Sequence, residues 1–182
     1  MARAKVELEL PPAGSNFLAP FERVGLFIDG KHLFSVGAAL EFQIDFRRLL
    51  KLLRDRARLI KASFYTVATD DNRSLIDWLD YNGFNVVTKV AGDATYNGHA
   101  ADFAINVELA VDVMQLANAL DHIVLVSGKA EFRRLVALLQ QNGKRVTVLS
   151  TMSTQPSMIR DELRRQADQF IDLADLRDVL QR

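Results

Sequence analysis

The feature of the sequence that most restricts its fold is a set of short apolar runs, rich in β-branched residues, that alternate with helical patterns. The runs are RVGLFID at 23–29, RLIKASFYTVA at 58–68, NVVTKV at 85–90, HIVLVSG at 122–128 and RVTVLS at 145–150. Each has the length of a strand that is buried on both faces, and the segments between the runs have the spacing of amphipathic helices. This alternation predicts an α/β protein, namely a three-layer α/β/α sandwich around a mainly parallel sheet of five to six strands.

The longest helical pattern is ADFAINVELAVDVMQLANAL at 101–120. Its apolar positions include Phe103, Val107, Ala110, Val111 and Met114, which predict the face that packs on the sheet. The apolar residues of AVDVMQLANAL exceed the number that one sheet face needs. Together with the VELEL run near the N-terminus, they predict a homodimer.

Breaks in the pattern divide the chain into three parts. Residues 1–22 are expected to form an arm that is interrupted by Pro11, Pro12 and Gly14, and its KVELEL run could add an edge strand. Residues 23–174 form the predicted domain, and residues 175–182 a C-terminal tail. No stretch approaches the ~20 apolar residues of a membrane span or the pattern of a signal peptide. We therefore expect a cytoplasmic protein with no membrane partner.

Charge and cysteine content narrow the function classes. The chain has 23 basic and 23 acidic residues, so no overall field attracts nucleic acid, and binding of RNA would need a local basic patch. The chain has no cysteine, which excludes disulfides, cysteine nucleophiles and zinc sites that contain cysteine.

Several charged and polar residues follow the predicted strands, where ligands of open α/β sheets bind. Asp29 ends the first strand, while Lys129 and Glu131 follow the fourth. Asp102 and Asn106 lie four residues apart, on one face of the long helix. Carboxylates that converge at strand ends are typical of Mg²⁺ or Mn²⁺ sites that hydrolyse phosphodiesters.

Several motifs occur together in order: GLFIDG, NVELAVDVMQLA, DHIVLVSG with EFRRLV, GKRVTVLS and ELRRQADQFIDL. On these motifs the run from about Arg23 to Leu173 resembles the NYN domains of the PIN-like nuclease superfamily, in particular the LabA-like bacterial branch. The resemblance implies a PIN-like, Rossmann-like sheet and a ribonuclease fold with a site of four acids.

Three of those four acidic positions, and two positions near them, depart from the pattern that the resemblance implies. The family's Asp-Gly-x-Asn has His32 in its fourth place, and the helix has Asp102 and Asn106 where the family has a lysine and a catalytic aspartate. The family's Ser-Gly-Asp-x-Asp-Phe is replaced by SGKAEF, so Lys129 stands at one acidic position and Glu131 at the other. Only Asp29 is unchanged.

An ammonium group at an acidic position would repel Mg²⁺ by several kcal/mol at an effective dielectric constant near ~20. We expect Lys129 to take the place of the cation and to pair with Asp29 and Glu131. The first hypothesis is therefore a catalytically degenerate domain, a pseudo-nuclease without cofactor or bound metal. It would act as an RNA-binding module or as a protein-interaction and regulatory module.

Two other hypotheses stay open. One is a divalent-metal-dependent endoribonuclease with a rearranged site, in which Asp102 joins Asp29 and Glu131 and the cofactor is Mg²⁺ or Mn²⁺. In that case Asp29 and Glu131 are the expected metal ligands. The other is a small-molecule phosphate site built from Lys129 and the helix N-terminus after Ala130.

The predicted nucleic-acid contacts are Lys31, His32, Ser127, Arg133 and Arg134. Lys144 and Arg145 could extend this basic patch, although an ordinary charged helix surface is the competing interpretation. Two further pairs each have two interpretations. Trp78 and Tyr81 are packing residues or base-stacking residues, and Glu108 and Asp112 form a charged stripe or a second metal pair.

Overall fold

The computed structural model describes residues 17–90 and 98–182, and the arm's KVELEL run lies outside them. Within these residues, six strands form one sheet: β1 (Arg23–Asp29), β2 (Arg58–Ala68), β3 (Asn85–Val90), β4 (His122–Val126), β5 (Arg145–Ser150) and β6 (Gln169–Asp172). The helices of the same residues are α1 (Gly30–Ala39), α2 (Phe46–Arg56), α3 (Arg73–Tyr81), α4 (Gly98–Leu116), α5 (Arg133–Gln141), α6 (Asp161–Gln166) and α7 (Arg177–Leu180). Short 3₁₀ turns connect them: η1 (Asp70–Asn72), η2 (Ala117–Ala119), η3 (Ala130–Phe132) and η4 (Leu173–Leu176).

The sheet has the order β3-β2-β1-β4-β5-β6, and every neighbouring pair of strands is parallel. The chain builds outward from β1 through β2 to β3, and then returns to the other side of β1 to add β4, β5 and β6. The prediction of a three-layer α/β fold with a parallel sheet is confirmed. Such an order has a switch point between β1 and β4, where the connections leave in opposite directions and open a crevice at the strand ends.

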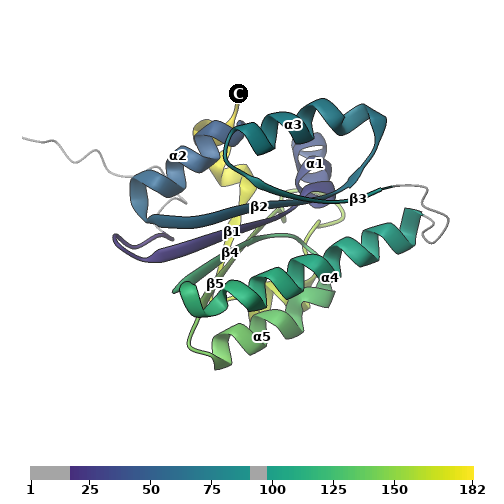
Figure 1. Cartoon of the computed structure of the whole chain (residues 1–182). Helices are drawn as coiled ribbons and strands as arrows, with labels where there is room; N and C mark the ends of the chain where they lie inside the picture. Colours follow the sequence, from purple (N-terminus) through teal and green to yellow (C-terminus); the bar gives the residue numbers. More distant parts are fainter. Residues whose placement is uncertain (1–16, 91–97) are drawn as a thin grey trace, which may run out of the picture.

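Alternate residues of the central strands enter two separate cores. In β1, Leu26 and Ile28 belong to the core beneath α1, α2 and α3, whereas Phe27 belongs to the core that includes Leu109 of α4 and Val136 of α5. Figure 1 shows these two helical layers on opposite faces of the sheet. Because both faces of the sheet are covered, the strand sequences are continuous apolar runs and do not alternate between apolar and polar residues.

The face of α4 that packs on the sheet differs from the predicted one. Phe103, Val107 and Val111 are exposed to solvent, and the buried side chains include Ile105 and Leu109. The correction has a simple cause: α4 is apolar on two faces, so its periodicity does not reveal which face meets the sheet.

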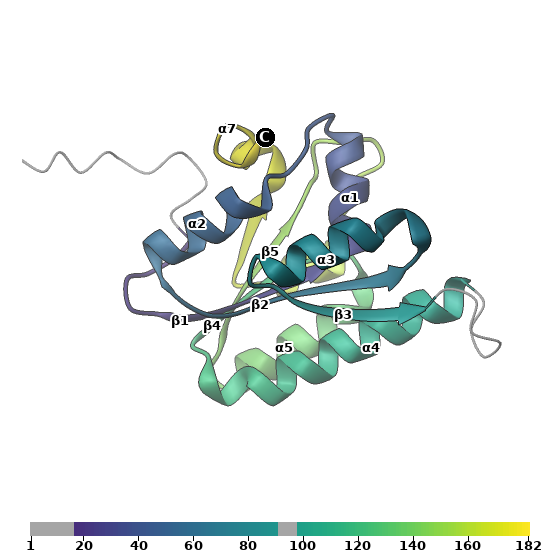
Figure 2. The ribbon, with the colours of Figure 1, turned by 45° about the horizontal axis from the view of Figure 1, so that its top comes forward.

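The C-terminal residues 175–182 are part of the fold and not a tail. Leu176 and Leu180 are buried in the core beneath α2, and Gln181 forms an antiparallel bridge with Ile44. The Arg182 backbone N–H donates to the Gln43 carbonyl at 3.1 Å. Figure 2 shows α7 beside the N-terminal end of α2.

The described end of the arm is also anchored to the domain. Phe17 is 1% exposed, and its ring meets that of His122 edge-on at 6.5 Å. Glu22 accepts a hydrogen bond from Arg145 at 3.0 Å. Residues before the predicted boundary at residue 23 therefore pack on the domain. None of the described helices has both the length and the apolar character that a bilayer crossing requires.

Candidate functional site

Asp29 lies at the switch point, at the carboxyl end of β1, and caps the N-terminus of α1. Its side chain is 3% exposed, and Oδ1 accepts from the His32 backbone N–H at 3.2 Å. Because β1 and β4 pair in parallel, the end of β4 places Ser127 beside Asp29, and the Ser127 hydroxyl donates to Asp29 Oδ2 at 3.2 Å. A buried carboxylate with this position needs a cationic partner.

Lys129 is that partner. Its Nζ lies 2.9 Å from Asp29 Oδ2 and donates to Asn106 Oδ1 at 2.9 Å. The lysine side chain is 27% exposed, so most of its aliphatic stem is covered while the ammonium group reaches inward. The predicted pairing of Lys129 with Asp29 is therefore present, and Asn106 supplies the second contact.

Glu131 is not the second partner of Lys129, which corrects the prediction. It lies exposed on η3, and among residues 17–90 and 98–182 its carboxylate has no ion-pair or hydrogen-bond partner. Lys129 precedes η3 in an extended conformation, with φ −81° and ψ 129°. The two side chains therefore separate, and Glu131 instead lines a surface groove beside Asn106.

Asp102 forms an ion pair with Lys31 of α1. Asp29, Asp102 and Glu131 each have different neighbours, so the structure does not gather the three acids of the rearranged metal site. Among the described residues, no group of three or more His, Cys, Asp or Glu side chains is arranged to hold a metal ion.

His32 and Ser127 are interior residues and do not form a nucleic-acid surface, contrary to their predicted role. His32 is 8% exposed and its Nε2 lies 2.9 Å from the hydroxyl of Ser150, at the end of β5. Burial lowers the pKa of His32 to about 4, and the charge of Lys129 adds to this effect although Asp29 opposes it. The imidazole is therefore neutral near pH 7 and links α1 to β5. The sequence analysis does not include Ser150 among the site residues, although its position at the end of a predicted strand is a signal that could have identified it.

Gly128 permits a close approach of the 151–160 segment to this cluster. A Cβ atom at residue 128 would lie 1.9 Å from the Met158 carbonyl oxygen and 2.7 Å from Cε1 of His32. The Gly128 carbonyl accepts from the Arg160 N–H at 2.9 Å. Only glycine fits between β4 and this segment, which covers one side of the cluster.

The predicted basic residues occupy two different places. Lys31, Arg133 and Arg134 are exposed at the strand-end edge, near the switch point. Lys144 donates to the Leu120 carbonyl and Arg145 donates to Glu22, both at the opposite edge of the sheet. The structure therefore separates Lys144 and Arg145 from the predicted patch. Of the other three, Arg133 and Arg134 lie together on α5, and Lys31 of α1 is paired with Asp102.

Glu108 and Asp112, the alternative second metal pair, each have a partner from the sheet. Glu108 accepts from Lys89 Nζ at 2.6 Å, and Asp112 accepts from the Tyr65 hydroxyl at 2.9 Å. Burial and this carboxylate raise the pKa of Tyr65. These acids serve to dock α4 on β2 and β3.

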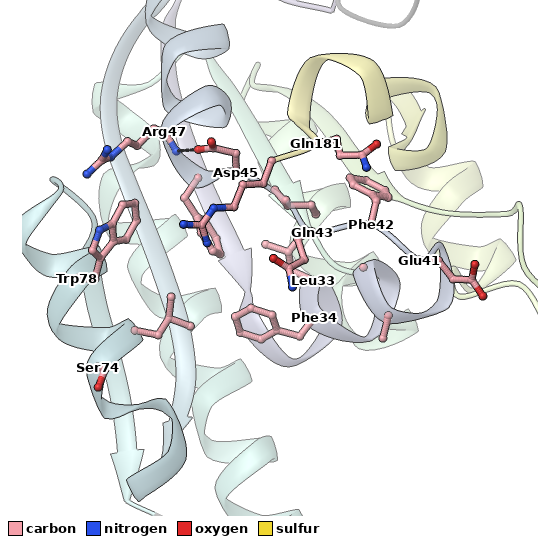
Figure 3. Close-up of a pocket in the computed structure, with 16 residues that line it drawn as sticks. Leu33, Phe34, Glu41, Phe42, Gln43, Asp45, Arg47, Ser74, Trp78 and Gln181 are labelled. Atoms are coloured by element: carbon pink, nitrogen blue, oxygen red, sulfur yellow. Dashed lines mark hydrogen bonds between the residues drawn. The ribbon is translucent and has the colours of Figure 1, made fainter.

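A large cavity in the described residues lies apart from the switch point. It has a volume of about 1230 Å³, and of the residues considered for a site in the sequence it includes Trp78 alone. Figure 3 shows Phe34 of α1 and Trp78 of α3 on its walls. Trp78 packs 6.4 Å from Phe46 and under the Arg47 guanidinium at 5.2 Å, so it is a packing residue, while Tyr81 is 90% exposed. We assign the candidate site to the switch point because that is where buried charged groups converge.

Comparisons with known proteins identify the family of the chain. The model of the NYN domain family matches residues 23–174. The protein "Low amplitude and bright protein LabA" of Synechococcus elongatus is 31% identical over 168 residues, which cover 88% of each chain. A crystal structure of a protein of unknown function from Vibrio parahaemolyticus is 22% identical and superimposes with a TM-score of 0.70, over 84% of this chain and 93% of that one. The chain therefore belongs to the NYN domain family and is related to LabA.

Proposed function

We propose that this NYN domain is a pseudo-nuclease that acts by binding a partner and does not cleave RNA. The observation that carries the proposal is the position of Lys129 Nζ, 2.9 Å from both Asp29 and Asn106. A positive charge already neutralises the buried carboxylate, at the place where a nuclease of this fold would need a metal ion.

The donor set does not fit Mg²⁺ or Mn²⁺. A divalent cation of this kind requires several oxygen ligands, among them carboxylates. In the part of the chain that the structure describes, Asp29 is the sole carboxylate of the cluster, Asn106 contributes a neutral oxygen and Lys129 offers no acceptor. Metal binding would have to displace an ammonium group that is paired and hydrogen-bonded.

Metal-dependent stability and RNA cleavage test this proposal together. The natural chain should show no cleavage of a mixed RNA pool with Mg²⁺ or Mn²⁺, and Mn²⁺ should leave its melting temperature unchanged. The double variant Lys129→Asp/Asn106→Asp should melt at a higher temperature when Mn²⁺ is added, because ligand binding to the folded state stabilises it. Mn²⁺-dependent cleavage by the natural chain that is lost in Asp29→Ala would reject the proposal in favour of the ribonuclease hypothesis.

The exposed cations at the same edge support RNA as the partner class. Arg133 and Arg134 project from α5 near the switch point, and phosphate contacts from such residues are independent of sequence. Lys31 of α1 is exposed at the same edge but is already paired with Asp102. The variant Arg133→Ala/Arg134→Ala should bind RNA less tightly and with a salt dependence that is smaller by about one to two phosphate contacts.

A matched control removes two exposed cations from the other face of the sheet. Lys51→Ala/Arg54→Ala on α2 should bind RNA as tightly as the natural chain does. Equal loss in both variants would mean that binding follows total charge and not this edge. Failure of any RNA to bind would leave a protein partner as the remaining class of ligand.

A further inference from the structure

Helix α4 carries an apolar surface that faces away from the sheet. Phe103 is 67% exposed, Val107 is 47% exposed and Val111 is 46% exposed, although Ile105 and Leu109 already anchor the helix to the core. A helix that is apolar on both faces is normally covered on both. This outer face therefore indicates a surface that another molecule covers.

The outer face continues into a groove between α4 and α5, which lie side by side in Figures 1 and 2. The groove has a volume of about 600 Å³, and Ala110, Met114 and Leu135 contribute to its apolar lining. Among its lining residues Glu131 alone is charged. A lining of this kind selects an apolar occupant and not a charged one.

The exposed residues Phe103 and Val107, together with the partly buried Ala110 and Met114 of the groove, have the spacing of a helix that pairs with another helix. Phe103, Val107, Ala110 and Met114 follow one another at intervals of four, three and four, which is the heptad pattern of a coiled-coil stripe. In an antiparallel pair related by a two-fold axis, Phe103 of one copy meets Met114 of the other, and Val107 meets Ala110. Each contact joins a larger side chain to a flexible or smaller one, so the stripe is complementary to itself.

The symmetric spacing of the stripe favours a second copy of the chain as the occupant, and the net charge and the size of the face permit it. The net charge is zero, so two copies experience no overall repulsion as they approach. With 19 residues, α4 is about 28 Å long, and α5, with nine residues, is about 14 Å long, so at a spacing of roughly 10 Å the two helices cover roughly 400 Å² in projection. Specific interfaces bury about 600–1,000 Å² of accessible surface on each partner, so this face corresponds to a small interface and a concentration-dependent dimer.

We propose that the chain forms a two-fold dimer in which α4 packs antiparallel against α4 of a second copy. The interface would also border the switch point, because Asn106 lines the groove and accepts the hydrogen bond from Lys129. The dimer therefore restricts access to the lysine-filled cluster from the α4 side. This inference is independent of the proposed pseudo-nuclease function, since an active ribonuclease could dimerise in the same way.

Light scattering of the full chain over a wide range of concentration is the first test. The natural chain should give a particle of twice the 20.4 kDa chain mass. Val107→Glu should weaken the dimer by at least roughly a hundredfold, since an unpaired carboxylate would be buried in the interface. Val107 is exposed in the single chain, so a melting curve should show that the variant still folds.

Tyr81→Glu is the matched control, because Tyr81 is 90% exposed on α3. It should leave the dimer intact. A natural chain that stays monomeric, or a dimer that survives both Val107→Glu and Phe103→Glu, would overturn the proposal.

Thiol cross-linking tests the antiparallel arrangement, since the chain has no cysteine of its own. A mixture of Val107→Cys and Ala110→Cys chains should form a disulfide between the two variants more readily than either variant forms one alone. Cross-linking that is strongest within Ala110→Cys alone would reject this register. A monomer in which Phe103→Cys resists a thiol reagent until residues 1–16 are removed would assign the outer face to that segment and would also overturn the proposal.

Discussion

At the scale of single residues, the ion pair at the switch point couples two side chains that are 100 residues apart in sequence, Asp29 and Lys129. Lys129→Met should destabilise the fold by about 2–4 kcal/mol, because it leaves a buried carboxylate without a partner. Adding Asp29→Asn should recover most of that loss, since the asparagine side chain can still cap α1 and has no charge to compensate. Urea unfolding of the natural chain, both single variants and the double variant gives the coupling energy. Losses that simply add would show that Lys129 stabilises the fold without regard to Asp29.

The fit at Gly128 gives a second prediction at this scale. Gly128→Ala should cost at least about 3 kcal/mol, because its Cβ would collide with the Met158 carbonyl and with His32. Gly143→Ala is the comparison: Gly143 has φ +71° and no atom within 4 Å of the new Cβ, so only about 1–2 kcal/mol of backbone strain is expected. The unfolding free energies of the two variants measure the difference. Equal losses would mean that Met158 yields easily to the methyl group.

The composition of the site could be predicted from sequence only in part. Asp29 and Lys129 were found because strand ends converge in a parallel sheet, and Asn106 because it follows Asp102 by one helical turn. The positions of Glu131 and His32 could not be predicted in the same way. Their side-chain directions depend on the conformation after Gly128 and on the approach of the 151–160 segment, neither of which has a local sequence signal.

At the scale of elements, α7 contributes to the core although it contains only one turn. Leu180 is fully buried against α2, so Leu180→Ala should cost about 2–5 kcal/mol. Gln181→Ala, next to it and exposed, should change the unfolding free energy by less than about 0.5 kcal/mol. Thermal or urea unfolding of both variants tests whether the C-terminal residues belong to the cooperative unit. A negligible effect of Leu180→Ala would mean that the C-terminal residues do not contribute to the stability of the domain, as expected of a tail.

The positions of the helices and strands could largely be predicted from sequence. Which face of a helix packs on the sheet could not. The strand runs and the stop of α3 at Gly83, which has φ +92°, are local signals that the structure confirms. The orientation of α4 depends on which of two apolar faces forms the better contact with β1 and β2. That choice is made by tertiary packing and has no counterpart in the periodicity.

At the scale of the whole molecule, two buried histidines make stability depend on pH. Burial lowers the pKa of His32 and of His122 from 6.5 to about 4. Between these values the unfolded chain binds a proton that the folded chain does not, so the stability present above pH 6.5 is lost as the pH falls towards 4. Each histidine can contribute up to about 3 kcal/mol to this loss.

The variant His32→Asn isolates one of the two contributions. Its unfolding free energy should fall less between pH 7 and pH 4.5 than that of the natural chain, while the acidic residues common to both proteins contribute equally and cancel. Urea unfolding at the two pH values measures this slope, namely the change of the unfolding free energy with pH. An unchanged slope would mean that His32 is protonated in the folded chain without cost.

The central place of β1 in the sheet has a consequence for how the chain is made. β1 pairs on one side with β2, which follows soon after, but its other edge waits for β4, and Val24 meets His122 only about 100 residues later. At about 5–20 residues per second, a ribosome leaves that edge open for roughly 5–20 s. An open edge of an apolar strand is a template for pairing with another chain. The strand that ends in Asp29 is thus the first of the sheet to be synthesised, and it waits longer for its second neighbour than β2, β4 or β5 does. Newly made chains are therefore most exposed to misassembly at the strand on which the finished site depends.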